Sequence, residues 1–224
     1  MAQGFETYRV DEYWSAVQSV MPAESHLLGA PGHNSLGYRG AEPAWDQPHV
    51  VFVGDERTKG GGIDDRQRWT FEVASRMGAA EINFGRADAS NEWIMAQAIR
   101  VIELYQPRMV VQWTDPGRYL FADEKGRYRD FLEDTTIDRK GRFLQSRVET
   151  ARRAFYDIAT PGLGLHRLML NATLLAELAD AMGSRLIQVG AFLDDASLAF
   201  FGARVECVPG PTDGLAEAIL EKLR

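Results

Sequence analysis

The chain has little cysteine, little histidine and no excess of positive charge. It contains one cysteine and four histidines in 224 residues. A single cysteine cannot form an internal disulfide or a cysteine metal cluster, so we expect a reducing compartment. With 25 basic and 32 acidic residues, the formal net charge is −7. That charge gives no overall attraction for nucleic acid or for an anionic membrane, so we expect neither as a partner.

Long hydrophobic runs are also missing. No apolar stretch approaches the roughly 20 residues that a membrane span needs. The opening residues, MAQGFETYRVDEYW, carry acids where a secretion signal has bases, and they lack its apolar core. We therefore expect a protein without a secretion signal, located in the cytoplasm unless it is carried elsewhere in an assembly. The 45% of hydrophobic residues is ordinary for a globular chain and excludes a disordered or collagen-like one.

The first 48 residues differ from the rest. A short amphipathic stretch, 10–20, is followed by a segment up to residue 48 in which Pro and Gly recur. Pro removes backbone donors and Gly favours turns, so this composition predicts an extended arm with little regular structure. We expect residues 1–48 to form that arm and residues 49–224 to form one domain.

Beyond residue 48, short apolar runs alternate with segments of helical periodicity. The runs read as buried strands at 49–54, 81–85, 109–113, 185–190 and 203–207. Helical spacing occurs at 67–77, 90–105, 143–158, 163–182 and 213–223. The polar, charged segment 118–142 favours neither a helix nor a strand, and its part 134–142 predicts a solvated loop or a lid over the crevice. Strands separated by helices imply parallel pairing, so the sequence predicts a three-layer α/β/α sandwich whose ligands bind at the carboxyl ends of the strands.

Four of the predicted strands begin or precede recognisable sequence motifs. VFVGDERTKGGGI, INFGRADASN, VVQWTDPGR and ECVPGPTDGLAEAIL resemble the four blocks of the SGNH (GDSL) hydrolases. The third resembles a branch of that family with Trp-Thr and a following Arg. The upstream NSLGYRG resembles a segment that precedes the first block in many bacterial and phage members. The resemblance covers 34–223 and implies a five-stranded parallel sheet in flavodoxin-like order.

The resemblance places the family's catalytic positions on residues of other types. The nucleophilic serine falls on Glu56, and the oxyanion positions fall on Asp88 and Thr114. The catalytic histidine falls on Val208, with its acid on Glu206 or Val205. All four histidines precede the last block. Acyl transfer needs a nucleophile, a base and oxyanion donors, so these substitutions predict loss of the family's usual mechanism.

The predicted crevice is rich in charge. Its lining residues are Asp55, Glu56, Arg57, Asp88, Asn91, Thr114, Asp115 and Arg118. Carboxylates in one crevice repel each other unless something neutralises them. We favour pairing with Arg57, Arg86 and Arg118, and expect no cofactor. A divalent cation on Glu56, Asp88 and Asp115 is the alternative. In either case, carboxylates at these positions are expected to repel an oxyanion.

A displaced catalytic triad is a further possibility. Ser90 opens a predicted helix, His166 lies near the start of another, and Asp115 or Asp194 would complete the set. We favour the simpler interpretation that Ser90 is a helix cap.

Two functions remain open from the sequence. The favoured one is a catalytically degenerate SGNH-like domain that serves as a binding or structural module, for example in a bacteriophage tail or capsid. Its partner, or a second copy, would be bound through residues 1–48. The alternative is an active esterase or acetylhydrolase on acylated glycans or small esters, with Glu56 acting on water.

Overall fold

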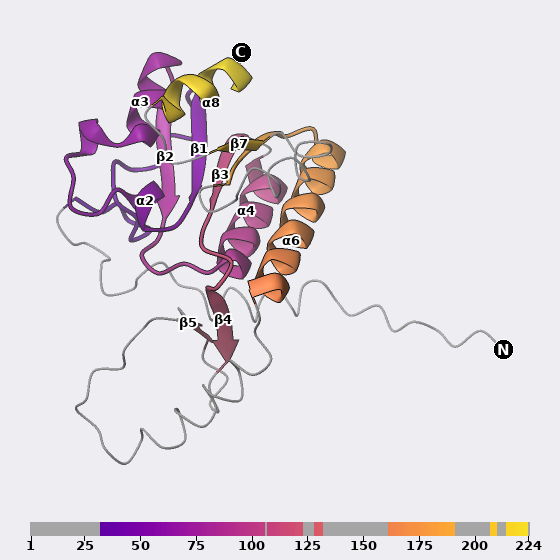
Figure 1. Cartoon of the computed structure of the whole chain (residues 1–224). Coiled ribbons are helices and arrows are strands. Elements are labelled where there is room, and N and C mark those ends of the chain that lie inside the picture. Colours follow the sequence, from indigo (N-terminus) through magenta and orange to yellow (C-terminus); the bar gives the residue numbers. More distant parts are fainter. Residues whose placement is uncertain are drawn as a thin grey trace, which may run out of the picture.

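A twisted parallel sheet forms the centre of the molecule (Figure 1). The structure is a computed structural model, and it describes residues 32–105, 107–122, 128–131, 161–190, 207–209 and 214–223. Five strands pair in the order β2-β1-β3-β6-β7. They are β1 (His49–Gly54), β2 (Ala80–Gly85), β3 (Arg108–Trp113), β6 (Arg185–Gly190) and β7 (Cys207–Pro209). This is the flavodoxin-like order, and it confirms the predicted fold class.

Helices cover both faces of the sheet (Figure 1). Helices α4 (Asn91–Tyr105) and α6 (Pro161–Met182) lie on one face, and α3 (Trp69–Arg76) and α8 (Leu215–Leu223) lie on the other. Alternate residues of β1 point to opposite faces of the sheet. Val51 and Val53 pack in the core under α4 and α6, while Val50 and Phe52 pack in the core under α3 and α8. Both faces of the strands are therefore apolar, as the sequence predicted.

The strands end at the same edge of the sheet. Gly54 of β1 is in register with Gly85 of β2, and Trp113 of β3 is in register with Gly190 of β6. Residues that directly follow β1, β2 and β3 therefore meet at one edge. The short helix α2 (Glu56–Lys59) begins there, immediately after β1.

The end of the last strand differs from the sequence prediction. The described strand β7, Cys207–Pro209, runs two residues beyond the predicted end at Cys207, because its pairing with β6 continues from Gln188 to Gly190. Residues 203–206 lie outside the described ones. A two-stranded antiparallel hairpin, β4 (Tyr119–Ala122) with β5 (Tyr128–Phe131), lies in the segment 118–142 that the sequence left unassigned. The strands were not predicted because the mixed polar sequence of this segment lacks a clear apolar pattern. The loop or lid predicted at 134–142 lies outside the described residues. The predicted helix at 143–158 lies outside the described residues.

The segment before β1 packs on the domain. Tyr38 is 7% exposed and belongs to the core, where its ring meets Phe84 edge-on at 4.8 Å between centroids. Trp45 stacks on Tyr105 at the end of α4, with ring centroids 3.7 Å apart. Residues 32–48 form no helix or strand beyond a single bridge, as predicted, but they are packed against the domain. The rest of the predicted arm, 1–31, lies outside the described residues.

Within the described ranges, no helix is both long and apolar enough to span a membrane.

Candidate active site

Asp55 is the first residue beyond β1, and it organises the edge of the sheet. Its side chain is the N-cap of α2, where Oδ1 accepts the Arg57 N–H at 3.0 Å. Its other oxygen, Oδ2, accepts a hydrogen bond from the Thr114 hydroxyl at 2.7 Å. Asp55 is 3% exposed and Thr114 is 1% exposed. A buried carboxylate must be hydrogen-bonded, and these two donors meet that need without an arginine side chain.

Asn91 connects the end of β3 to the start of α4. Its Oδ1 accepts the Thr114 N–H at 2.9 Å, and its Nδ2 donates to the Thr114 carbonyl at 3.2 Å. The same Nδ2 lies 3.3 Å from the Asp115 carbonyl. Asn91 is buried, so these bonds fix the turn that follows β3. Asp55, Thr114 and Asn91 thus form one buried network beneath the predicted crevice.

Glu56 is exposed and lies over the glycine-rich turn that follows α2. A Cβ atom built on Gly61 would be only 1.5 Å from Glu56 Oε1. The carboxylate therefore occupies the space that any other residue at position 61 would fill. The Gly60 N–H donates to the Glu56 carbonyl at 2.8 Å and closes the helix.

Asp88 lies in the loop after β2 with a φ of 55°, and it is the one described non-glycine residue with positive φ. Glycine adopts this conformation freely, whereas an L-residue pays roughly 1 kcal/mol for it. The loop thus retains the backbone shape of the glycine that the resemblance predicts here. The Asp88 side chain is 86% exposed, and its N–H reaches no acceptor among the described residues.

This geometry bears on the expectation that Glu56, Asp88 and Asp115 repel an oxyanion. The Asp88 carboxylate extends into solvent, and Thr114 contributes no charge. At the end of β2, Asp88 therefore contributes its backbone N–H as a hydrogen-bond donor, while its carboxylate lies in solvent. For Glu56 and Asp115 the expectation stays a prediction.

Arg118 lies beside Asp88. Its Nη2 is 3.8 Å from Asp88 Oδ1, and the Arg118 side chain is 17% exposed. Nε and Nη1 of Arg118 are buried and have no hydrogen-bond partner in the described part of the chain. The Arg118 N–H donates to the Asp115 carbonyl at 3.0 Å, which places this arginine on the turn that Asn91 fixes. The guanidinium is a positive group with spare donors at the carboxyl edge.

Pairing of the crevice carboxylates with arginine is present in part. Arg118 faces Asp88, and the Arg86 guanidinium lies 5.2 Å above the ring of Trp93. The Asp115 carboxylate accepts the Gly117 N–H at 2.7 Å. Among the described residues, no three His, Cys, Asp or Glu side chains are grouped as metal ligands. Glu56, Asp88 and Asp115 are all described, so the proposed three-carboxylate cation site is not formed.

Ser90 and His166 occupy the positions that the sequence predicted for them. Ser90 is fully buried, and its Oγ accepts the Trp93 N–H at 3.3 Å as the cap of α4. His166 is exposed on the first turns of α6. Asp194 lies outside the described residues. The cap role of Ser90 is confirmed, and a displaced triad stays a prediction.

The base position of the last block lies in a strand. Val208 belongs to β7 and is in register with Val189 of β6. Glu206 and Val205, the two positions for its acid, lie outside the described residues.

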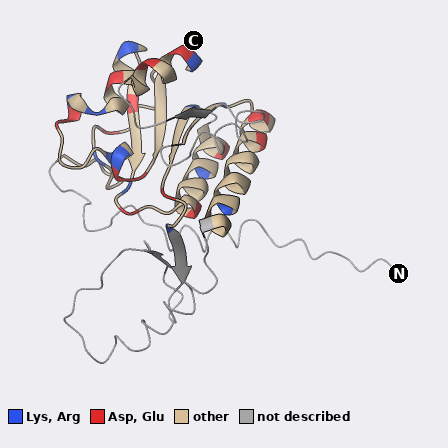
Figure 2. Ribbon diagram, viewed as in Figure 1, with Lys and Arg blue, Asp and Glu red and all other residues tan. Residues whose placement is uncertain are grey.

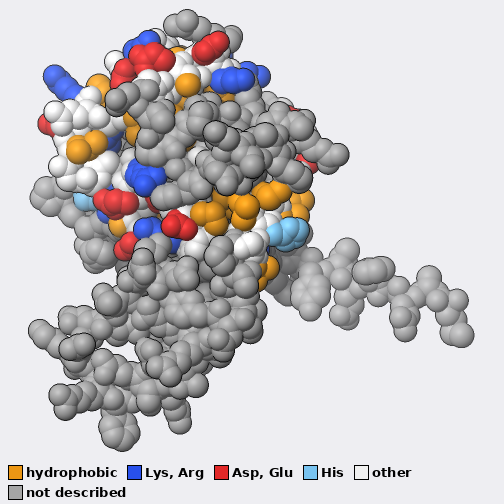
Figure 3. All heavy atoms as spheres, in the orientation of Figure 1, with side chains coloured by type: hydrophobic (Ala, Val, Ile, Leu, Met, Phe, Trp, Pro, Cys, Tyr) orange, Lys and Arg blue, Asp and Glu red, His pale blue; other side chains and the backbone are white. Residues whose placement is uncertain are grey.

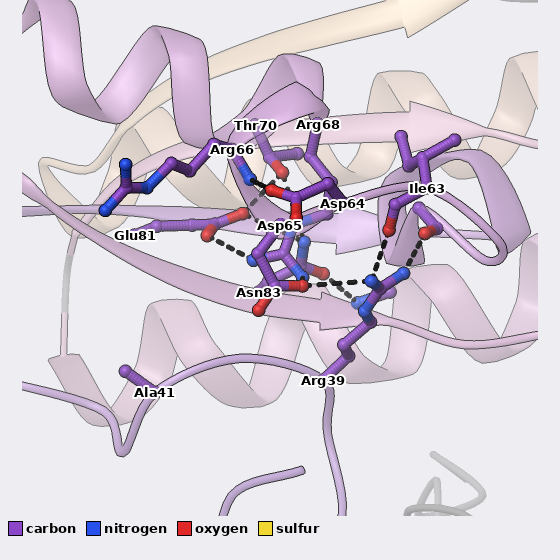
Figure 4. A network of polar contacts seen from close by, with 12 residues as sticks. Arg39, Ala41, Ile63, Asp64, Asp65, Arg66, Arg68, Thr70, Glu81 and Asn83 are labelled. Carbon is purple, nitrogen blue, oxygen red and sulfur yellow. Dashed lines mark hydrogen bonds and ion pairs between the residues drawn. The ribbon is translucent and has the colours of Figure 1, made fainter. Parts of the chain in front are cut away.

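Sequence reasoning missed the polar network behind the glycine turn (Figure 4). It joins Arg39, Asp65, Arg68, Thr70, Glu81 and Asn83. Arg68 is 2% exposed and pairs with Glu81 at 2.7 Å. Fully buried arginines are rare, but nothing in the local sequence marks Arg68 as buried, because its shorter ion pair is with Glu81 of β2.

Charges of both signs lie along the loops at the carboxyl edge (Figure 2). In the space-filling view, acidic and basic side chains lie close together next to an apolar area of the surface (Figure 3).

No protein-family model and no curated protein matches this chain. Several solved structures do. The chain is similar to TesA, with 12% identity, a TM-score of 0.49, and coverage of 79% of this chain and 98% of that one. It is similar to AlinE4, an SGNH-hydrolase family esterase, with 13% identity, a TM-score of 0.44, and coverage of 79% and 82%. It is also similar to a lipolytic protein of the G-D-S-L family from Veillonella parvula, with 8% identity, a TM-score of 0.40, and coverage of 78% and 94%.

Proposed function

We infer that the chain belongs to the SGNH-hydrolase superfamily, and we propose that it hydrolyses carboxylic esters with Glu56 as the general base. The family inference rests on the order of the sequence motifs along a sheet of flavodoxin-like order. One observation carries the catalytic proposal. The exposed Glu56 carboxylate follows β1, and the Asp88 N–H, which has no acceptor among the described residues, follows the neighbouring strand β2.

The two groups belong to one small region. The Arg86 N–H, at the start of the loop that holds Asp88, donates to the Gly54 carbonyl at 3.0 Å, two residues before Glu56. From the other side, the Asp55–Thr114 bond ties the end of β3 to the same turn. Substrate bound at this edge would meet a base from one strand end and donors from the next two.

The proposed reaction uses water as the nucleophile. Glu56 accepts a proton from water as the water oxygen bonds to the ester carbonyl carbon. Negative charge then develops on the former carbonyl oxygen, where the Asp88 N–H donates and the positive Arg118 stabilises it. When the bond to the alcohol oxygen breaks, protonated Glu56 returns the proton to that oxygen. The products are the acid and the alcohol, and no covalent enzyme intermediate forms.

A non-catalytic binding module is the second candidate. It is favoured by the absence of serine at the position of Glu56 and by the place of Val208 in a paired strand. Removing a nucleophile or base from a serine triad costs several orders of magnitude in rate. A role in a virus particle, and partner binding through residues 1–48, stay predictions. In the described part of that segment, Tyr38 and Trp45 already contact the chain's own domain.

Substitution of Glu56 tests the proposal. Glu56→Gln keeps the size of the side chain and removes the base. We expect kcat for a short acyl ester to fall roughly 10²- to 10⁴-fold, the usual range for loss of a general base. The matched control is Glu72→Gln on α3, an exposed carboxylate that pairs with Arg76 at 3.2 Å. The kcat of Glu72→Gln should stay within about twofold of the starting protein, since Glu72 has no part in the proposed reaction.

Two results would oppose the proposal in different ways. A starting protein with no ester hydrolysis would favour the binding module. Full activity in Glu56→Gln would leave the enzyme but remove Glu56 as its base.

A further inference from the structure

The turn that supports Glu56 is flexible by composition. Residues 60–62 are three consecutive glycines, and Gly60 and Gly62 have φ values of +69° and +77°. Glycine has more conformational freedom to lose than any other residue, so a glycine turn needs outside contacts to keep one shape. The position of the Glu56 carboxylate depends on that shape because the carboxylate lies against Gly61.

Arg39 supplies those contacts from a distant part of the sequence. Its Nη1 donates to the Gly60 carbonyl, and its Nη2 donates to the Ile63 carbonyl. Nη2 also pairs with Asp65 Oδ1 at 3.0 Å. Figure 4 shows the guanidinium directed at Ile63 and Asp65. One planar group therefore holds both ends of the turn, a geometry that suits the fork of arginine and not the single ammonium of lysine.

Arg39 itself is held firmly. The side chain of Asn34 accepts the N–H groups of Leu36 and Tyr38 at 3.1 and 3.0 Å. The Tyr38 ring, next to Arg39, is in the core. On the other side, the Gly40 N–H donates to the Gly32 carbonyl at 3.0 Å. The segment that carries Arg39 is thus a fixed point from which the side chain reaches the turn.

Arg68 also packs against the turn. A Cβ atom at Gly60 would be 2.5 Å from two side-chain carbons of Arg68, so the turn lies directly on this buried side chain. Arg68 is in turn fixed by Glu81 at 2.7 Å and by Asp65 at 3.1 Å. Asp65 joins the two arginines, since it also pairs with Arg39. The glycine turn is therefore in contact with both Arg39 and Arg68.

We propose that Arg39 is a positioning residue for Glu56 and acts on it through the glycine turn. The proposal rests on the proposed role of Glu56 as the base. Arg39 is expected neither to touch substrate nor to exchange protons. Its contribution is to hold residues 60–63, and so the Glu56 carboxylate, in the arrangement that catalysis needs. The segment 34–40, which the sequence marked only by resemblance, thereby gains a physical role at the site.

Arg39→Gln tests the proposal, with Arg76→Gln as its matched control. Arg76 also has carboxylate partners, Glu72 and Glu217, but it lies on α3, away from the turn. In Arg39→Gln, amide hydrogen exchange at Gly60 should accelerate by roughly tenfold or more, because the turn opens locally. For a short acyl ester, kcat should fall roughly tenfold or more while KM changes by less than about threefold. Arg76→Gln should change neither quantity.

Combination with Glu56→Gln separates positioning from general stability. If Arg39 acts through Glu56, then adding Arg39→Gln to Glu56→Gln should lower kcat no further. An additional tenfold loss in the double variant would overturn the proposal. Unchanged exchange at Gly60 in Arg39→Gln would also overturn it. If Arg39→Gln does not fold, Arg39→Lys serves in its place, with a smaller effect of the same kind expected.

Failure of the proposed function remains distinguishable. If the starting protein hydrolyses no ester, the catalytic role of Glu56 falls. The carboxylate ¹³C resonance of Glu56 then tests the positioning directly. A changed chemical shift in Arg39→Gln, with none in Arg76→Gln, supports positioning of Glu56 by Arg39. An unchanged shift in Arg39→Gln overturns it.

Discussion

Replacing Gly61 by alanine should remove activity without unfolding the protein. The new Cβ would lie 1.5 Å from Glu56 Oε1, whereas ordinary contacts begin at 3.4 Å. The carboxylate must therefore move by about 2 Å. Misplacing a catalytic group by about 1 Å can cost roughly 10²-fold in rate, so we expect kcat for a short acyl ester to fall at least that far.

The cost in stability should be small, because the atom that must move is the far end of a flexible, exposed side chain. Gly61 does not have the positive φ of its two neighbours, so alanine can adopt its backbone conformation. Gly→Ala at such a site can even stabilise a protein by about 0.4–1 kcal/mol. Thermal unfolding should show a Tm within a few degrees of the starting protein.

Gly62→Ala is the control, and it should lower stability while leaving kcat largely unchanged. Nothing lies within 4 Å of its added Cβ, but φ at this position is +77°. The backbone strain should lower stability by about 1 kcal/mol while Glu56 stays in place and kcat is largely kept. Unchanged kcat in Gly61→Ala would refute the placement of the Glu56 carboxylate. So would a loss of kcat that tracks a loss of folded protein.

Three further predictions concern the surroundings of the site and a distant ion pair. Asp88→Gly relieves the left-handed backbone strain and keeps the backbone N–H. The urea midpoint of unfolding should therefore stay the same or rise, and kcat should not fall. A loss of kcat would contradict the role of the backbone N–H of residue 88 as the oxyanion donor. Thr114→Val removes the donor to the buried Asp55 carboxylate, and chemical unfolding should show a loss of about 1–3 kcal/mol, whereas an unchanged free energy would mean that water replaces the hydroxyl. The hydrogen bond from Arg76 lowers the pKa of Glu217, so that Arg76→Ala should raise it towards 4.5 in an NMR titration. Because the folded pKa is the lowered one, the stability from this pair is present above pH 4.5 and is lost as pH falls through the folded pKa.

The sequence predicted the regular part of the fold well. Four of the strands and the helices at α3, α4, α6 and α8 agree within a few residues with the predicted ranges, because their apolar periodicity reports burial directly. The order of the sheet came from resemblance, since local patterns do not encode which strands are neighbours. The hairpin of β4 and β5 was missed because its pairing is not visible in a mixed polar segment.

The sequence predicted which residues lie at the candidate site but not which of them contact each other. Asp55, Asn91, Thr114 and Arg118 do lie at the carboxyl edge, as parallel strands require. Their partners could not be predicted, because Asp55 and Thr114 are 59 residues apart in the sequence. The direction of the Asp88 side chain depends on a positive φ that composition does not reveal. The same limit applies to Arg39, whose contacts cross 21 residues to reach Gly60.

The most direct test of the account measures ester turnover and covalent labelling on the same sample. The protein is treated with a fluorophosphonate probe, which labels activated serines, and its intact mass and its rate on a short acyl ester are recorded. Catalysis by Glu56 through water predicts turnover with no added mass, and a rate that the probe leaves unchanged. A mass adduct accompanied by loss of activity would contradict it, because a serine would then be the nucleophile.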